Sequence, residues 1–362
     1  MALLWMDGFD HYGTGSTGRG NMLNGVYAEL GAVPVNGNPS TAFPRTGTHS
    51  FTGDFGTDKS ALRRVILKGA ISTIGMGGAF YFTNLPVNND NAVLMDLRSV
   101  ANVVLFRLIL QSTGVLKVQQ VGGGAWSYET PLPIVVTEAF QHIEMKTTLD
   151  AVNGAVEVRW NGVTVINQSG LNLGSVACGQ VNVLSRIISG LSPSLTAYLD
   201  DYFAWDDSGT MNNDFLGDRR VRTLYPNANT AVADWTVTGA ASGYEAIDET
   251  APDFETTYIS ATPPTGDPLV PVVSEFELQD PPVDIGAIAA VQTYIMQRKT
   301  EAGDCNTQSS LISGVDVSAG TDRPITEEYT YWMDVFELDP ATGTPWTEAS
   351  LTAAKLRIAR TL

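Results

Sequence analysis

Six aspartates fall within nineteen positions near the middle of this 362-residue chain, in the stretch YLDDYFAWDDSGTMNNDFLGDRRVRTLYP. They are Asp200, Asp201, Asp206, Asp207, Asp214 and Asp218. Carboxylates so closely spaced could supply the acid and base of a hydrolase, the oxygen ligands of a calcium ion, or acceptors for turns and loops. The flanking residues distinguish these three possibilities.

Calcium is the metal that this stretch could bind. Asp206, Asp207 and Asp214 are the candidate ligands, and the neighbouring Asn212 and Asn213 offer further oxygen donors. Their spacing does not match an EF-hand loop, and the chain's two cysteines, Cys178 and Cys305, form no metal motif. We therefore expect no cofactor, with calcium as the one possible ion.

Asp200 and Asp201 differ from the later acids because large apolar residues flank them. We expect one of the pair to face inward, and to accept hydrogen bonds from loop N–H groups or pair with a nearby arginine such as Arg219, Arg220 or Arg222. The later acids lie among Ser, Gly, Thr and Asn residues, which are typical of solvated turns. The cluster is thus predicted to be structural, with no catalytic residue.

Other catalytic patterns are weak. The three histidines accompany no G-x-S-x-G nucleophile motif, and no strand carries the E-x-D-x-x-E pattern of β-glucanases. Glu144 and Glu157 are expected on adjacent strands with Lys146 and Arg159, as charge pairs on a solvated face. His142 is expected to be an exposed surface histidine. The prediction is a protein that is not an enzyme.

The elements that carry these residues read as strands. In residues 140–170, apolar and polar residues alternate, and Asn161-Gly162 has the composition of a type I′ hairpin turn. Many short strands between turn signals predict an all-β chain. Residues 1–215 are predicted to form one β-sandwich, 216–233 a linker, and 234–362 a second, smaller, acidic β-sandwich with a short helix near the C-terminus.

Two further predictions concern the segment near the N-terminus and the helix near the C-terminus. The Gly-rich residues 13–40 read as loop, and the G-x-G-x-x-G at Gly13, Gly15 and Gly18 reads as a chance match to a dinucleotide motif. The helix near the C-terminus is expected within 344–360, with Thr344 or Thr347 as its N-cap.

The net charge of −18 limits the classes of partner that are expected. Residues 216–362 hold 22 acidic and 9 basic residues, so the acid is concentrated in the second part. Such a surface repels phosphate backbones, so nucleic acid is not expected as a partner. The sequence has no 18-residue apolar window and no recognisable signal peptide, so a chain made in the cytoplasm, without membrane association, is expected.

The opening MDGFDHY, the run HIEMKTTLDAVNGAVEVRWNGVTVINQSG and the aspartates before NNDFLGDRRVRTLYP resemble structural proteins of tailed bacteriophage virions with a concanavalin A-like or laminin G-like jelly-roll domain. The resemblance implies a concanavalin A-like jelly-roll sandwich over residues 1–215 and a non-enzymatic virion component, tail- or baseplate-associated. It also implies other virion proteins as partners, a homo-oligomer, possibly a trimer, and location in the virion. The alternatives are a capsid decoration protein, a receptor-binding module for a host-surface glycan, and a glycan depolymerase.

Overall fold

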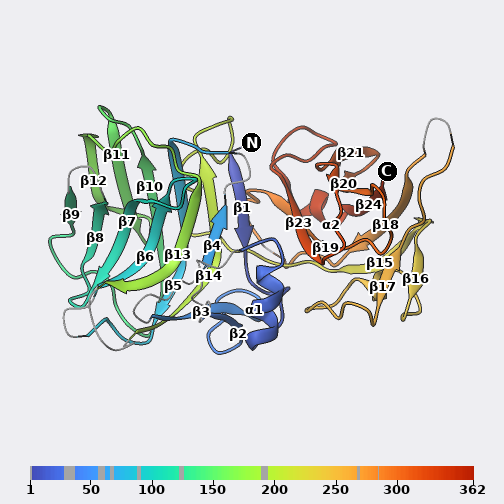
Figure 1. The fold of residues 1–362 in the computed structure, drawn as a ribbon, viewed down its shortest axis with the longest axis horizontal. Helices are drawn as coiled ribbons and strands as arrows, with labels where there is room; N and C mark the ends of the chain where they lie inside the picture. The colour runs from blue at the N-terminus through green and yellow to red at the C-terminus, as the bar shows by residue number, and fades with distance from the viewer. Residues whose placement is uncertain are drawn as a thin grey trace. The chain divides into compact units, whose positions relative to one another are not determined.

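The computed structural model describes residues 2–27, 37–55, 62–65, 69–87, 91–121, 126–188, 195–266, 270–283 and 285–362. The chain forms two compact units, Met1–Arg222 and Thr223–Leu362, and Figure 1 follows it through both. Residues 216–222, expected in the linker, belong to the first unit.

The first unit contains a larger antiparallel sheet of eight strands. Seven of them follow the order β12-β11-β10-β5-β14-β3-β2, and β1 pairs with β14. Their bounds are β1 Leu3–Asp7, β2 Asn38–Ser40, β3 Ser50–Phe55, β5 Thr73–Phe82, β10 Phe140–Thr148, β11 Gly154–Trp160, β12 Val163–Leu171 and β14 Leu195–Asp206.

A second sheet of six strands forms the other layer of the first unit, as Figure 1 shows, in the order β4-β13-β6-β7-β8-β9. Its strands are β4 Leu62–Val65, β6 Asn91–Arg98, β7 Val104–Gln111, β8 Leu116–Gln120, β9 Ser127–Glu129 and β13 Gln180–Ile188. Buried apolar side chains from both sheets, such as Met76, Leu97 and Met145, fill the core.

The alternation in β10 explains its place in the sandwich. Ile143 and Met145 point into the core, while His142, Glu144 and Lys146 lie on the opposite, outer face of the sheet. Asn161 and Gly162 join β11 to β12, and their φ angles of 48° and 80° are those of a type I′ turn.

The Gly-rich segment near the N-terminus is not all loop, contrary to expectation. Gly15–Leu23 forms helix α1, and Asn38–Ser40 forms the edge strand β2. Asn21, buried on α1, donates a 2.7 Å hydrogen bond to the carbonyl of Tyr12. Tertiary contacts therefore overcome the low helix propensity of the three glycines in α1, which are Gly15, Gly18 and Gly20.

The second unit is built on a six-stranded sheet in the order β15-β18-β24-β20-β21, with β22 paired to β20. Two ribbons, β16–β17 and β19–β23, complete it. The bounds are β15 Pro226–Ala233, β16 Thr236–Thr238, β17 Tyr258–Ser260, β18 Val272–Leu278, β19 Val291–Gln297, β20 Asn306–Ser313, β21 Asp316–Ala319, β22 Arg323–Pro324, β23 Thr330–Phe336 and β24 Lys355–Arg360. A 3-10 turn covers Tyr244–Ala246.

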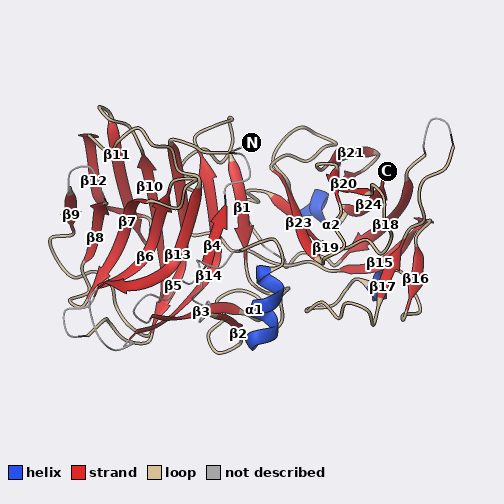
Figure 2. Cartoon of the chain, in the orientation of Figure 1, coloured by secondary structure: helices blue, strands red, loops and turns tan. Residues whose placement is uncertain are grey.

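Helix α2, Glu348–Thr352, is the short helix expected near the C-terminus. Thr347 is its N-cap, and its hydroxyl accepts a hydrogen bond from the N–H of Ser350. The helix is shorter than the pattern allowed, because the last apolar residues form β24 in the middle of the sheet. Figure 2 shows how few helices interrupt the strands, and the all-β fold class is confirmed. No helix among the described residues is long and apolar enough to cross a membrane.

Candidate functional site

The outer face of the larger sheet in the first unit brings the sequence candidates together. Strands β10, β5 and β14 are neighbours there, so their outward side chains form rows across the sheet. From one end, the rows are Phe140–Tyr81–Tyr198, then His142–Ala79–Asp200, then Glu144–Gly77–Phe203, then Lys146–Gly75–Trp205.

The first row is aromatic, and its three residues are half-buried. Tyr81 lies beside Phe140 and Tyr198, with ring centroids 5.4 and 6.1 Å apart. Phe43, from the loop between β2 and β3, stacks on Tyr81 at 4.4 Å. We call Phe43, Tyr81, Phe140 and Tyr198 the aromatic row. It presents rigid apolar faces with two phenolic hydroxyls at their edges.

Glycines on β5 make room for the third and fourth rows. A Cβ atom on Gly75 would lie 2.1 Å from ring atoms of Trp205, and one on Gly77 would lie 2.6 Å from Cγ of Glu144. These side chains therefore lie across the backbone of β5, and any larger residue there would displace them.

Residues 214–222, which we call the cover segment, follow β14 and run back across the third and fourth rows. Phe215 packs edge-on against Trp205, and the Arg159 guanidinium lies 3.8 Å from the centre of the Phe215 ring. The N–H groups of Leu216 and Gly217 donate to the Glu144 carboxylate at 3.0 and 3.2 Å. The cover segment thereby buries Glu144 completely.

Charged contacts hold both ends of the cover segment. At its start, Lys146 donates to Asp214 at 3.0 Å. Further along, Asp218 accepts two hydrogen bonds of 2.6 Å from the Arg45 guanidinium. Near its end, the Val221 N–H donates to Asp201 at 2.8 Å.

Asp200 and Asp201 are both fully buried. Asp200 accepts hydrogen bonds from the N–H groups of Arg45, Thr46 and Asp201. Besides Val221, Asp201 contacts the guanidinium groups of Arg45 at 3.2 Å and Arg220 at 3.5 Å. Burial raises the pKa of both carboxyls, and in Asp200 the neighbouring Asp201 raises it further. The pair therefore ties the loop before β3 and the cover segment to β14.

The structure corrects two expectations about β10. Glu144 and His142 lie on the outer face, as the alternation implies, but neither is solvated, because the cover segment and the adjoining loop lie over that face. Burial raises the pKa of Glu144 to about 7 and lowers that of His142 to about 4. Nδ1 of His142 is 3.9 Å from Oε2 of Glu144, and neither ring nitrogen has a hydrogen-bond partner within the described residues. Glu157 was expected to form a charge pair with a residue of the adjacent strand, but it pairs with Arg159 of its own strand.

The three calcium candidates do not converge. Asp206 is buried and accepts hydrogen bonds from the backbone and hydroxyl of Ser208, Asp207 is exposed, and Asp214 pairs with Lys146. Among the described residues, no three or more His, Cys, Asp or Glu side chains are placed to hold a metal ion. The acids of this stretch serve the turn after β14 and the cover segment.

Sequence reasoning did not find the aromatic row. Its four members lie 38 or more positions apart in the sequence. Only strand pairing aligns Tyr81, Phe140 and Tyr198. The available signal was the outward phase of each strand, since Tyr198 and Phe140 share their phase with Asp200 and His142.

No protein-family model and no curated protein matches the chain. Among solved structures, a protein titled "Cellulose induced protein, Cip1" has a TM-score of 0.41 and 14% identity over 55% of this chain and 96% of that one. The alginate lyase Aly36B has a TM-score of 0.37 and 10% identity over 55% and 95%. A sialidase has a TM-score of 0.38 and 12% identity over 56% of this chain, which spans 18% of that protein. Likeness of this degree concerns the sandwich fold and carries nothing about activity.

These neighbours correct the predicted role. A non-enzymatic structural component of a phage tail or baseplate is contradicted, because the structures found similar are titled as alginate lyases, a sialidase and a cellulose-induced protein.

Proposed function

We propose that this protein binds glycans through the aromatic row on the outer face of the larger sheet. The observation that carries the proposal is the alignment of Phe140, Tyr81 and Tyr198 across three adjacent strands, where all three are half-buried and Phe43 stacks on Tyr81. A sugar ring has one apolar face of C–H groups and a rim of hydroxyls. Tyrosine matches this chemistry, since its ring is apolar and its hydroxyl forms hydrogen bonds.

The fixed geometry of the row favours binding. Each ring sits on a paired strand or stacks on one that does, so little side-chain freedom is lost when a ligand packs against it. A row that crosses several strands also suits an extended chain of sugar units better than a single one, because successive rings can contact successive units.

The proposal assigns no catalytic step to this face. A glycan-cleaving acid or base must reach the bond that breaks. Glu144, Asp200 and Asp201 are fully buried beneath backbone that they themselves hold in place, so they stabilise the surface that binds.

A polysaccharide and oligosaccharide array, probed with the full chain, tests the proposal. We expect binding to a set of related glycans that is lost or strongly weakened in Tyr81→Ala and Tyr198→Ala. Tyr128→Ala is the matched control, because Tyr128 is a 42% exposed tyrosine on β9 of the other sheet. Array binding that survives both aromatic-row substitutions would refute the assignment, as would a folded wild-type chain that binds no glycan.

A further inference from the structure

Phe43 lies against the central ring of the aromatic row. It stacks on Tyr81, with ring centroids 4.4 Å apart and ring planes inclined by 22°, and it meets Tyr198 at 4.8 Å and 59°. A sugar unit that stacks on Tyr81 needs an accessible face of that ring. The face that Phe43 contacts is therefore closed to a sugar while Phe43 stays in place.

Phe43 differs from the other members of the row in the element that carries it. Tyr81, Phe140 and Tyr198 lie on the neighbouring strands β5, β10 and β14. Phe43 belongs to the loop 41–49 between β2 and β3. The three rings on strands keep their places when Phe43 leaves, so a surface for sugar is already formed beneath it.

Hydrogen bonds anchor the loop on both sides of Phe43. Before it, the Ala42 N–H donates to the hydroxyl of Ser40 at 3.2 Å. After it, the Arg45 N–H donates to the buried Asp200 carboxylate at 2.7 Å. Both chain neighbours of Phe43 are exposed, whereas Phe43 itself is half-buried. Its ring can therefore turn away from the row by side-chain rotation while the anchors hold.

We propose that Phe43 is an aromatic cap, which competes with a sugar unit for the face of Tyr81 and so sets the affinity of the row for glycan. This inference rests on the function proposed above. A glycan binds when its sugar ring takes the place of the Phe43 ring. Its apparent affinity is then the intrinsic affinity multiplied by the fraction of chains in which the cap is open.

The strength of aromatic contacts suits such a cap. One aromatic pair favours the closed state over the open state by roughly two- to tenfold. Most chains are then capped, yet a glycan that makes several contacts displaces the ring. Removing Phe43 should therefore tighten binding, whereas removing a ring that contacts the sugar, such as Tyr198, should weaken it.

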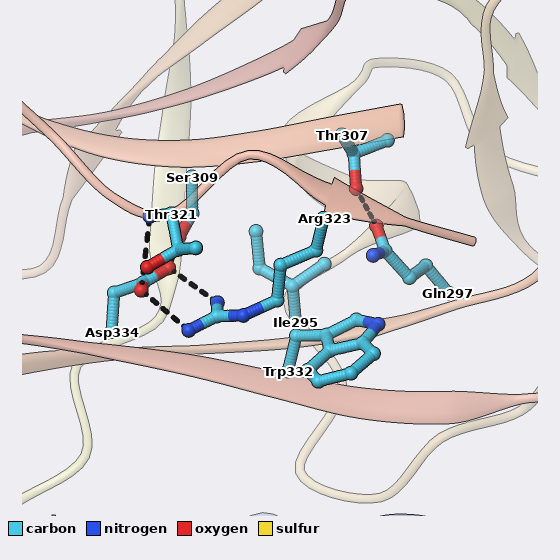
Figure 3. Close-up of a pocket in the computed structure, with 8 residues that line it drawn as sticks. All are labelled: Ile295, Gln297, Thr307, Ser309, Thr321, Arg323, Trp332 and Asp334. Carbon is cyan, nitrogen blue, oxygen red and sulfur yellow. Dashed lines mark hydrogen bonds and ion pairs between the residues drawn. The ribbon is translucent and has the colours of Figure 1, made fainter. Parts of the chain in front are cut away.

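The pocket of the second unit does not compete for a glycan. Figure 3 shows that side chains of its lining pair with one another, Arg323 with Asp334 and Thr307 with Gln297. Its cavity of about 10 Å³ has room for about one water molecule. This pocket therefore adds no binding of its own to a titration with an oligosaccharide.

Calorimetric titration of the full chain with cellohexaose, xylohexaose and mannohexaose tests the cap. We expect at least one of these neutral hexasaccharides to bind Phe43→Ala about fivefold more tightly than the wild type. Phe43→Leu, which loses the stacked ring but keeps an apolar side chain in the loop, should change in the same direction. Tyr128→Ala is the control and should bind like the wild type. Binding of all three hexasaccharides that is equal or weaker in Phe43→Ala overturns the proposal. If Tyr198→Ala still weakens binding in that case, the row binds glycan without a cap.

A second measurement needs no glycan. Tetranitromethane nitrates tyrosine rings that solvent reaches, and peptide mass spectrometry locates the product. Tyr81 is expected to react several times faster in Phe43→Ala than in the wild type, while Tyr128, on β9 of the other sheet, reacts equally in both. An equal rate at Tyr81 in the two proteins would show that Phe43 does not cover it. That result overturns the cap whether or not the row binds glycan.

Discussion

At the scale of single residues, Glu144 shows what sequence can and cannot give. The alternation in β10 correctly separates Glu144 and His142 from the core residues Ile143 and Met145. It cannot show that residues more than 70 positions later return to cover the outer face. Exposure on a sheet face depends on such non-local packing, which a period-two pattern does not encode.

Glu144 should make the first unit less stable as pH rises from 4.5 to about 7. Its pKa rises from 4.5 to about 7 on folding, so its contribution to stability is fully present below pH 4.5 and is lost as pH rises through 7. That shift corresponds to about 3 kcal/mol in the free energy of unfolding. We expect Glu144→Gln, which keeps an acceptor for the cover segment, to remove this part of the pH dependence.

Chemical denaturation of the wild type and Glu144→Gln between pH 5 and 9 measures the difference. Glu157→Gln is the control, since Glu157 lies on the adjacent strand but is only partly buried. The substituted chain should gain stability over the wild type as pH rises. A difference between the two chains that stays constant across this range would show that Glu144 does not titrate in the buried state.

At the scale of elements, many strands, one hairpin turn and the short C-terminal helix were predictable, whereas helix α1 and the cover segment were not. Asn161-Gly162 identified the β11–β12 turn through local chemistry, and Thr347 identified the start of α2. Helix α1 was missed because glycine-rich sequence favours loop, and the cover segment was read as linker because Asn, Asp and Gly mark turns in either setting. Helix α1 and the cover segment are both held in place by contacts with residues that are distant in the sequence.

The cover segment should be protected from solvent as one piece. In the wild type, the Leu216 and Gly217 amides donate to buried Glu144, so their hydrogen exchange should be slow for a segment outside the sheets. Phe215→Ala removes the contacts with Trp205 and Arg159, and should speed exchange at both amides by about tenfold or more. Asp207→Ala, at an exposed turn position, serves as control. Equal exchange in the three proteins would mean that the segment is not anchored through Phe215.

At the scale of the whole chain, the fold divides into two compact units, and the acid is concentrated in the second part. A closed homo-oligomer, possibly a trimer, stays a prediction, which sedimentation at micromolar concentration would test. The all-β class followed from strand patterns alone, whereas the alignment of the aromatic row required the register of β10, β5 and β14.

The central claim is that the aromatic row binds glycan. Its most direct test is calorimetric titration of the strongest glycan from the array into the wild type, Tyr198→Ala and Tyr128→Ala. We expect a dissociation constant at least about fivefold weaker in Tyr198→Ala and unchanged in Tyr128→Ala, because truncating an aromatic contact at a binding surface costs more than about 1 kcal/mol. Equal affinity in all three proteins, each folded, would contradict it.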